Sequence, residues 1–203
     1  ALVVQHDSLG EEWISLISNY DCSIKVVEDD KQLVQHFSKT YDLIVLADVH
    51  RNLGSDELDT LRQRVADGTV LIINGVSPFY LNLEENSYWL GAREFIEAPK
   101  DAKSNMTFTR EAKNILHEID PDKSYCLYTE MLYSTPTGCN IIEINTSVYA
   151  IRASDNVPVI FSHQYGDGAI IFSGVRPFFS SKAEDYDLYV RFVLKTLEPY
   201  LRS

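Results

Sequence analysis

The sequence has 203 residues, of which 45% are hydrophobic and 24% are charged. These proportions are typical of globular proteins and exclude a disordered chain; a domain of this length buries about 70% of its unfolded surface. The 30 acidic and 18 basic residues give a net charge of -12. The negative electrostatic field of such a chain opposes the binding of a nucleic acid or an anionic membrane, so we expect neither as a partner.

The first 75 residues alternate apolar runs with amphipathic segments, a rhythm that predicts parallel strands joined by helices. Strands are predicted at residues 2–5, 24–27, 41–47 and 69–74. The helices between them are expected to face inward with Trp13, Leu16 and Ile17, then Leu33, Val34 and Phe37, and then Leu58, Leu61 and Val65. Ser55 is predicted to cap the third of these helices, and Asp67-Gly68 to end it. The apolar run in residues 43–46 does not alternate, as in a strand covered on both faces.

Residues 76–137 contain four prolines and only short periodic pieces, such as residues 112–119, so we interpret them as an elaborated insertion. Strands are predicted again at residues 140–145, 148–153, 157–164 and 169–174. A hairpin turn at residues 165–168 joins the last two. A final helix is predicted at residues 185–197, with Tyr189, Phe192, Val193 and Leu197 on its inner side.

These elements predict an α/β fold of three layers, flavodoxin-like, with a mostly parallel central sheet and flanking helices. An antiparallel hairpin and the insertion complete it. No internal repeat or linker divides the chain, so we expect residues 1–203 to form a single domain.

The three cysteines, Cys22, Cys126 and Cys139, are far apart and form no CxxC motif. This spacing is typical of free or buried thiols in a reducing compartment, so a cytoplasmic protein is expected. No apolar run reaches the roughly 18 residues of a membrane span, and no basic segment precedes the apolar residues 1–4. We therefore predict neither a membrane anchor nor a signal peptide.

Several segments carry a resemblance to a known superfamily. They are residues 41–46, 61–73 and 89–92, then residues 158–160 and 165–171. Together they resemble the class I glutamine amidotransferase-like superfamily, particularly its branch of ThuA-like and β-galactosidase trimerisation-like domains. The resemblance covers most of the chain and implies the fold of that superfamily.

The catalytic residues that this resemblance would imply are missing. Amidotransferases of the superfamily use a cysteine on a sharp strand-to-helix turn and a His-x-Glu pair after a late strand. Residues 74–78 match the turn but hold Ser77 in place of a cysteine, and residues 173–179 contain neither His nor Glu. His163, one strand earlier, is expected to be a strand or surface residue. Because nucleophile and base act as a unit, we expect no catalytic residues and no glutaminase activity.

Polar residues follow two strands whose carboxyl ends should meet where the strand order reverses. His6 and Asp7 follow the first strand, while Asp48 and His50 follow the third. These side chains can bind a small polar ligand or, if they converge, a divalent ion such as zinc. Alternatively, the aspartates cap loop amides and the histidines face solvent.

Three further features are candidates for binding. Ser77 is a turn residue, a ligand-binding residue or, if a base lies within hydrogen-bond reach, a nucleophile. Arg176, after the last core strand, either binds a carboxylate or phosphate or pairs internally with Glu184 or Asp185. Aromatic residues of the insertion can form a ligand wall, an oligomer interface or a cover for the core; they are Tyr80, Tyr88, Trp89, Tyr125, Tyr128 and Tyr133.

The sequence therefore predicts a non-catalytic amidotransferase-like domain that binds a small polar ligand or a protein subunit, either as a homo-oligomer or with another protein domain. No cofactor and no resident metal are expected. The alternative is a hydrolase or metal-dependent enzyme that uses His6, Asp7, Asp48 and His50. A phosphoacceptor receiver domain also has acidic residues after strands one and three, but it is shorter and needs a lysine that we cannot place.

Overall fold

The computed structural model describes residues 1–6, 10–28, 33–47, 49–75, 77–96, 105–126, 138–141, 144–175 and 183–201. The strands are β1 (Leu2–Gln5), β2 (Lys25–Glu28), β3 (Leu43–Ala47), β4 (Val70–Asn74), β5 (Ala92–Ile96), β6 (Asn105–Phe108), β7 (Ser124–Cys126), β8 (Gly138–Ile141), β9 (Thr146–Arg152), β10 (Pro158–Tyr165) and β11 (Gly168–Ser173). The helices are α1 (Glu11–Ile17), α2 (Leu33–Phe37), α3 (Ser55–Ala66), the 3-10 helix η1 (Ser77–Tyr80), α4 (Leu83–Leu90), α5 (Arg110–Ile115) and α6 (Ala183–Leu201).

Among the described residues, nine strands form one sheet in the order β2-β1-β3-β4-β11-β10-β9-β6-β7. The five strands from β2 to β11 are parallel. The strands from β10 to β7 are added antiparallel, beginning with the β10–β11 hairpin. Because β1 lies between β2 and β3, the strand order reverses between β1 and β3. The predicted flavodoxin-like α/β fold is confirmed.

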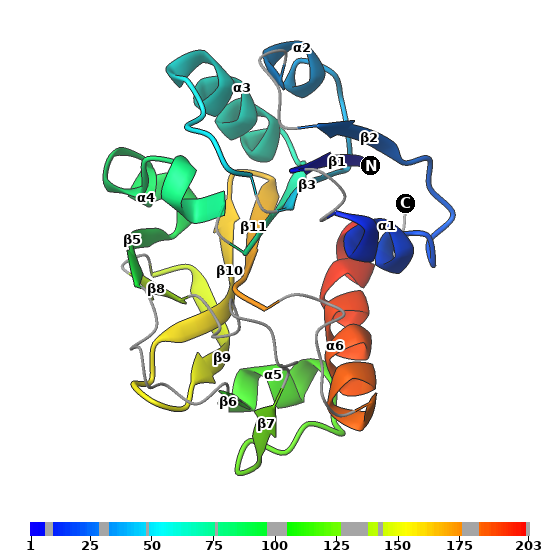
Figure 1. Ribbon diagram of the computed structural model, residues 1–203, viewed down its shortest axis with the longest axis vertical. Coiled ribbons are helices and arrows are strands. Elements are labelled where there is room, and N and C mark those ends of the chain that lie inside the picture. The colour runs from blue at the N-terminus through cyan, green and yellow to red at the C-terminus, as the bar shows by residue number, and fades with distance from the viewer. Residues whose placement is uncertain are drawn as a thin grey trace.

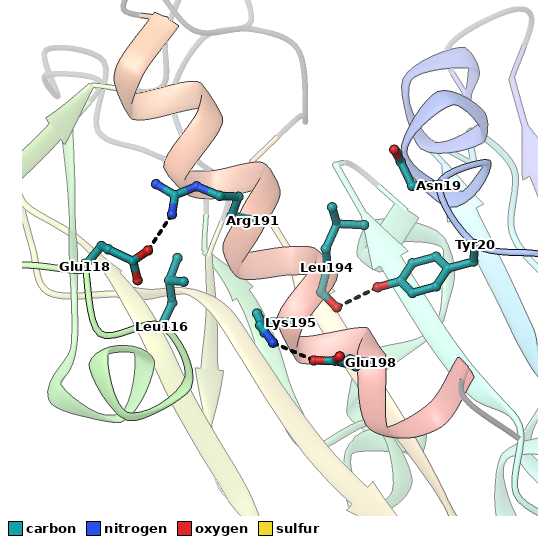
Figure 2. Close-up of a pocket in the computed structure, with 8 residues that line it drawn as sticks. All are labelled: Asn19, Tyr20, Leu116, Glu118, Arg191, Leu194, Lys195 and Glu198. Carbon is teal, nitrogen blue, oxygen red and sulfur yellow. Dashed lines mark hydrogen bonds and ion pairs between the residues drawn. The ribbon is translucent and has the colours of Figure 1, made fainter.

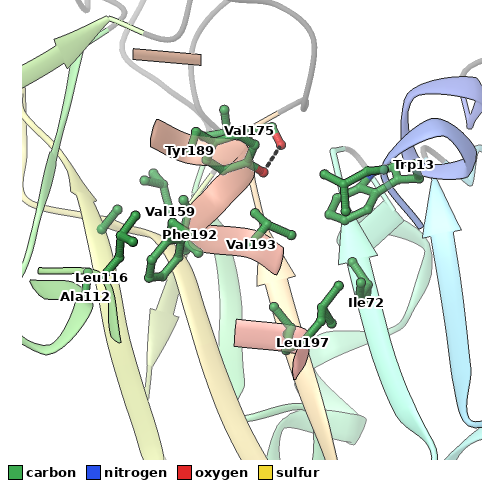
Figure 3. Packing of buried hydrophobic residues seen from close by; sticks show 14 of the residues in the cluster. Trp13, Ile72, Ala112, Leu116, Val159, Val175, Tyr189, Phe192, Val193 and Leu197 are labelled. Atoms are coloured by element: carbon green, nitrogen blue, oxygen red, sulfur yellow. Dashed lines mark hydrogen bonds between the residues drawn. The ribbon is translucent and has the colours of Figure 1, made fainter. Parts of the chain in front are cut away.

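Helices cover both faces of the parallel strands. Figure 1 shows α1 and α6 on one side of the sheet and α2, α3 and α4 on the other. Because side chains alternate along a strand, Val45 of β3 faces the α1 and α6 layer while Leu46 faces the opposite layer. Figure 3 shows residues of α6 such as Phe192 and Leu197 packing near Trp13 and Ile72. None of the helices in the described part of the chain has both the length and the apolarity to cross a membrane.

The region interpreted as an insertion is more regular than its sequence indicated. Strands β6 and β7 extend the main sheet beyond β9. Strand β5 pairs with β8 in a second, two-stranded antiparallel sheet. Trp89 and Tyr125 are buried in the two cores, as the packing alternative predicts, whereas Tyr128 and Tyr133 lie outside the described residues.

The start of α3 differs from the sequence prediction by one residue. Its N-cap is Gly54, not Ser55. The reason is the Glu57 carboxylate, whose Oε2 accepts the Gly54 N–H at 2.8 Å and so satisfies an amide at the helix start. The predicted end of the helix is confirmed, with Asp67 as the C-cap and Gly68 at a φ of +114°.

Candidate functional site

The carboxyl edge of the parallel strands brings together residues from three loops. His6 follows β1, His50 follows β3, and Ser77 and Tyr80 lie in η1 after β4. The imidazole rings of His6 and His50 are stacked, with centroids 4.4 Å apart and planes 22° apart. The Tyr80 ring lies 6.1 Å from that of His50 at an interplanar angle of 26°. We call these four residues the crest site.

The structure thus brings together His6 and His50, two of the residues nominated from the sequence. Asp7, Asp48 and Arg176 lie outside the described residues, and their roles stay predictions. The sequence places Tyr80 only among the aromatic residues of the insertion and does not link it to the histidines. The signal that would have linked them is that η1 directly follows β4, the neighbour of β3.

Two hydrogen bonds hold the loop after β3 against η1. The Val49 N–H donates to Ser77 Oγ at 2.8 Å, and the Leu53 N–H donates to the Tyr80 carbonyl oxygen at 3.1 Å. Val49 and Leu53 are buried, so His50 lies on a short segment anchored on both sides. His50 itself is exposed, and Tyr80 is half-buried against the core beneath α2 and α3. The scaffold therefore anchors the two segments that carry these rings.

Ser77 is the first residue of η1, which follows β4. Gly75 lies two residues before Ser77 and has a φ of +64°, which gives the chain a sharp turn after β4. Ser77 is fully buried, and its Oγ accepts the Val49 N–H and donates to the Leu46 carbonyl oxygen at 3.2 Å. A serine nucleophile must give its single proton to a base, and this proton is directed at a carbonyl oxygen. These bonds give Ser77 a structural role.

Ser77→Ala is expected to destabilise the protein by about 1–3 kcal/mol, because it leaves the buried Val49 N–H without its acceptor. Urea unfolding followed by circular dichroism measures this change. Ser15→Ala on the exposed side of α1 is the control and should stay within about 0.5 kcal/mol of the parent. Equal stabilities for the two variants would contradict the structural role of Ser77.

The ends of β4 and β11 are closed by internal hydrogen bonds. Asn74 Nδ2 donates to the carbonyl oxygens of Ser173 and Val175 at 2.8 and 2.9 Å. The Tyr189 hydroxyl donates to the Val175 carbonyl oxygen at 3.1 Å, the bond drawn in Figure 3, and lies 2.8 Å from Ser173 Oγ. All of these side chains are buried. The polar groups that end these two strands therefore serve the fold.

No cysteine with a described side chain lies at the crest site. Cys22 follows α1 and is exposed, while Cys139 lies in β8 and is buried. Burial raises the pKa of the Cys139 thiol, so this group stays protonated and is a poor nucleophile.

His163 also lies away from the crest. It is a strand residue as predicted, but it is buried in β10 and is not on the surface. Its Nδ1 lies 3.0 Å from Thr146 Oγ1. Gly91 covers the side chain so closely that a Cβ at position 91 would lie 2.5 Å from the Cβ of His163. His163 therefore has a packed, hydrogen-bonded place in the core and is not a displaced base.

The stacking of His6 and His50 constrains how they can bind a metal ion. An imidazole nitrogen ligates through a lone pair in the plane of its ring. Two rings stacked at 22° direct these lone pairs side by side, so at least one ring must turn before both ligate one ion. In the part of the chain that the structure describes, no group of three or more His, Cys, Asp or Glu residues is placed to hold a metal.

A groove of about 450 Å³ lies away from the crest, between α1, α5 and α6 (Figure 2). Its charged residues pair with each other: Arg191 lies 2.7 Å from Glu118, and Lys195 lies 2.9 Å from Glu198. The Tyr20 hydroxyl crosses from the end of α1 and donates to the Leu194 carbonyl oxygen. Sequence reasoning missed this groove because its residues come from separate segments that share no motif.

The parallel strand order and the sharp turn after β4 define an α/β protein of flavodoxin-like fold. Neither a protein-family model nor a curated protein matches the sequence. Solved structures do match. A putative GMP synthase subunit from Thermoplasma acidophilum is 14% identical, with a TM-score of 0.62, over 98% of this chain and 94% of that one. The mmIFT52 N-terminal domain is 11% identical, with a TM-score of 0.67, over 97% and 96% of the two chains.

A third match is a β-galactosidase from Bacillus circulans sp. alkalophilus. It is 11% identical, with a TM-score of 0.61, and the match covers 98% of this chain but only 30% of the β-galactosidase. At these identities the matches show the fold alone. The same fold thus occurs both in a chain of similar length and as part of a much longer enzyme.

Proposed function

We propose that residues 1–203 form one non-catalytic domain of the amidotransferase-like superfamily, in its ThuA-like and β-galactosidase trimerisation-like branch. The domain binds a small polar ligand at the crest site and docks with a protein subunit or a second copy of itself. The observation that carries this proposal is the state of Ser77, which is buried and uses its hydroxyl to hold the neighbouring loop.

We expect no glutaminase activity from the groups at the crest site. Amide hydrolysis by this superfamily needs a thiolate or an activated hydroxyl beside a base. The Ser77 proton points to the Leu46 carbonyl oxygen, and the two imidazoles stack on each other. Among the described residues, these arrangements suit binding and direct the Ser77 proton to a carbonyl oxygen and not to a base.

Binding at the crest is supported by the convergence of three rings at the reversal in strand order. Ligands of open α/β sheets commonly bind there, outside the carboxyl ends of the strands. His50 is exposed and lies on an anchored segment, so a ligand can reach it without displacing the core. Preorganisation of this kind lowers the entropic cost of binding.

Association with a protein partner is supported by the comparisons. One matching structure is that of a synthase subunit, and in the β-galactosidase the matched part is less than a third of the chain. The fold thus occurs in a protein described as a subunit and as one part of a longer chain. The exposed free thiol of Cys22 favours a reducing compartment such as the cytoplasm.

Ligand binding is tested by a saturation-transfer NMR screen of small polar metabolites against the purified protein. We expect at least one specific ligand whose affinity falls about tenfold or more in His50→Ala, since loss of one good contact costs about 1.4 kcal/mol. His117→Ala, at an exposed histidine near α5, is the matched control and should bind normally. Equal binding by both variants would place the ligand elsewhere and contradict the proposal.

A second candidate function is metal-dependent catalysis by His6, Asp7, Asp48 and His50, and the closeness of His6 and His50 favours it. Zinc titration calorimetry tests it. If the four residues form the site, His6→Ala and His50→Ala each abolish stoichiometric zinc binding while His117→Ala does not. Absence of zinc binding to the unmodified protein would exclude this candidate.

A further inference from the structure

The crest site has the geometry of a clamp for a flat ring. We propose that it takes an uncharged heteroaromatic ring, of the size of a purine base, between the rings of His50 and Tyr80. This inference rests on the proposed ligand-binding function and names the class of ligand. It is carried by the stacked arrangement of the three rings and by the way the scaffold holds them.

His6 supports one side of the clamp. Its ring stacks on His50 at a centroid distance of 4.4 Å, while the Tyr80 ring lies 6.1 Å from that of His50 and is also nearly parallel to it. Stacked aromatic rings attract each other and prefer near-parallel, offset arrangements. The His6 ring therefore keeps the exposed His50 ring from turning freely.

The separation of the His50 and Tyr80 ring centroids is close to what an inserted ring needs. Two rings that hold a third between them stand about 7 Å apart, twice the carbon–carbon contact distance of about 3.5 Å. The present separation is 6.1 Å, and the planes open at 26°. A displacement of the exposed imidazole by about 1 Å is enough to admit a ring. Tyr80 is packed against the core, so it forms the fixed side.

The charges around the site favour an uncharged ligand. Arg51, next to His50, is held by Glu57, whose carboxylate oxygens lie 2.8 and 2.6 Å from its Nη1 and Nη2. This guanidinium is therefore already engaged by a carboxylate. The whole chain carries a net charge of -12, which repels an anion. A nucleoside suits the site better than its phosphate ester.

Adenosine is the probe for this inference, with ribose and adenosine monophosphate as comparison probes. Titration by saturation-transfer NMR should show saturable binding of adenosine, with the strongest transfer to the base protons. Adenosine monophosphate should bind more weakly, and ribose not at all. Aromatic stacking is worth about 1–3 kcal/mol per ring, so Tyr80→Leu and His50→Ala should each weaken adenosine roughly tenfold or more.

Variants that keep or avoid the ring provide the controls. Tyr80→Phe preserves the ring and should retain affinity within about threefold. Tyr88→Ala removes an exposed tyrosine of α4 outside the crest site and should leave binding unchanged. Thermal unfolding identifies any variant that fails to fold. If Tyr80→Leu does not fold, the comparison of His50→Ala with Tyr88→Ala decides.

Two results would overturn the inference: no saturable adenosine binding, or binding that Tyr80→Leu and His50→Ala leave unchanged. Tighter binding of adenosine monophosphate than of adenosine would overturn the claim of an uncharged ligand. If a metabolite without an aromatic ring binds and depends on His50 while adenosine does not bind, the ring clamp is wrong and the proposed function stands. If neither binds at the crest, both are wrong.

Discussion

Asp155→Ala is expected to destabilise the protein by about 2–3 kcal/mol, because it removes the carboxylate that accepts two hydrogen bonds from a buried guanidinium. Arg152 of β9 is fully buried, and its Nε and Nη2 donate to Asp155 Oδ1 and Oδ2 at 2.9 and 2.8 Å. Solvent reaches the Asp155 side chain, which is 27% exposed, so the expected cost lies below that of a wholly buried pair. Urea unfolding of the purified variant measures the change.

The matched control is Asp59→Ala, which removes the carboxylate partner of Arg62 on the surface of α3. Both members of that pair are exposed, so the change should cost less than about 1 kcal/mol. If the two variants lose the same stability, the Arg152–Asp155 pair does not anchor the turn between β9 and β10 in the way described.

The same pair makes stability depend on pH. A bidentate hydrogen bond from Arg152 holds the pKa of Asp155 below its usual range. The unfolded chain, whose aspartate pKa is about 3.9, therefore takes up a proton before the folded protein does. The stabilisation is fully present above that value and is lost as the pH falls through the lower folded pKa. Unfolding free energies measured below about pH 4 should fall more steeply for the parent protein than for Asp155→Asn.

Gly168→Ala is expected to destabilise the protein by about 3 kcal/mol, at the upper end of the range for overpacking. A Cβ on Gly168 would lie 2.2 Å from the Val65 carbonyl oxygen and 2.3 Å from that of Thr69. Both are backbone atoms, so no side chain can turn away to make room. Relief requires that the start of β11 moves away from the end of α3, which disturbs the pairing of β11 with β4.

Gly54→Ala serves as the comparison because its Cβ would meet nothing closer than Glu57 Oε2 at 3.8 Å. Gly54 has a φ of -71°, which alanine adopts readily, so the cost should stay within about 1 kcal/mol. Thermal unfolding of both variants gives the comparison. A Gly168→Ala protein as stable as Gly54→Ala would show that the contact between α3 and β11 is loose.

The parallel half of the fold was predictable because its residues carry strong local signals. The continuous apolar run of residues 43–46 predicted a strand buried on both faces, and β3 is buried throughout. The inward faces of α1, α3 and α6 followed from helical spacing, and their predicted residues are in the core. Hydrophobic periodicity alone decides such elements.

The antiparallel extension of the sheet was less predictable. Strands β6 and β7 have only 4 and 3 residues, too few for a clear alternation. Strand β6 is placed by pairing with β9, which begins 38 residues after the end of β6, at Thr146, and β7 is placed by pairing with β6. Tertiary contacts of this kind override weak local preferences.

The candidate site was predicted in part. The rule that ligands bind at the carboxyl ends of strands nominated His6 and His50, and their rings do meet. The rule could not show that the rings stack, because stacking depends on the rotamers that the loops permit. It also could not assign the Ser77 hydroxyl to Val49, since that bond joins residues of two loops that the sheet brings together.

Measurement of glutaminase activity tests the central claim most directly. Glutamine labelled with ¹⁵N at its amide is incubated with the purified protein, and the amide and ammonium signals are followed by NMR. The account predicts a rate of ammonium release equal to that of buffer alone, for the parent protein and for Ser77→Ala alike. Ammonium release by the parent that Ser77→Ala abolishes would show that Ser77 is a nucleophile and would contradict the account.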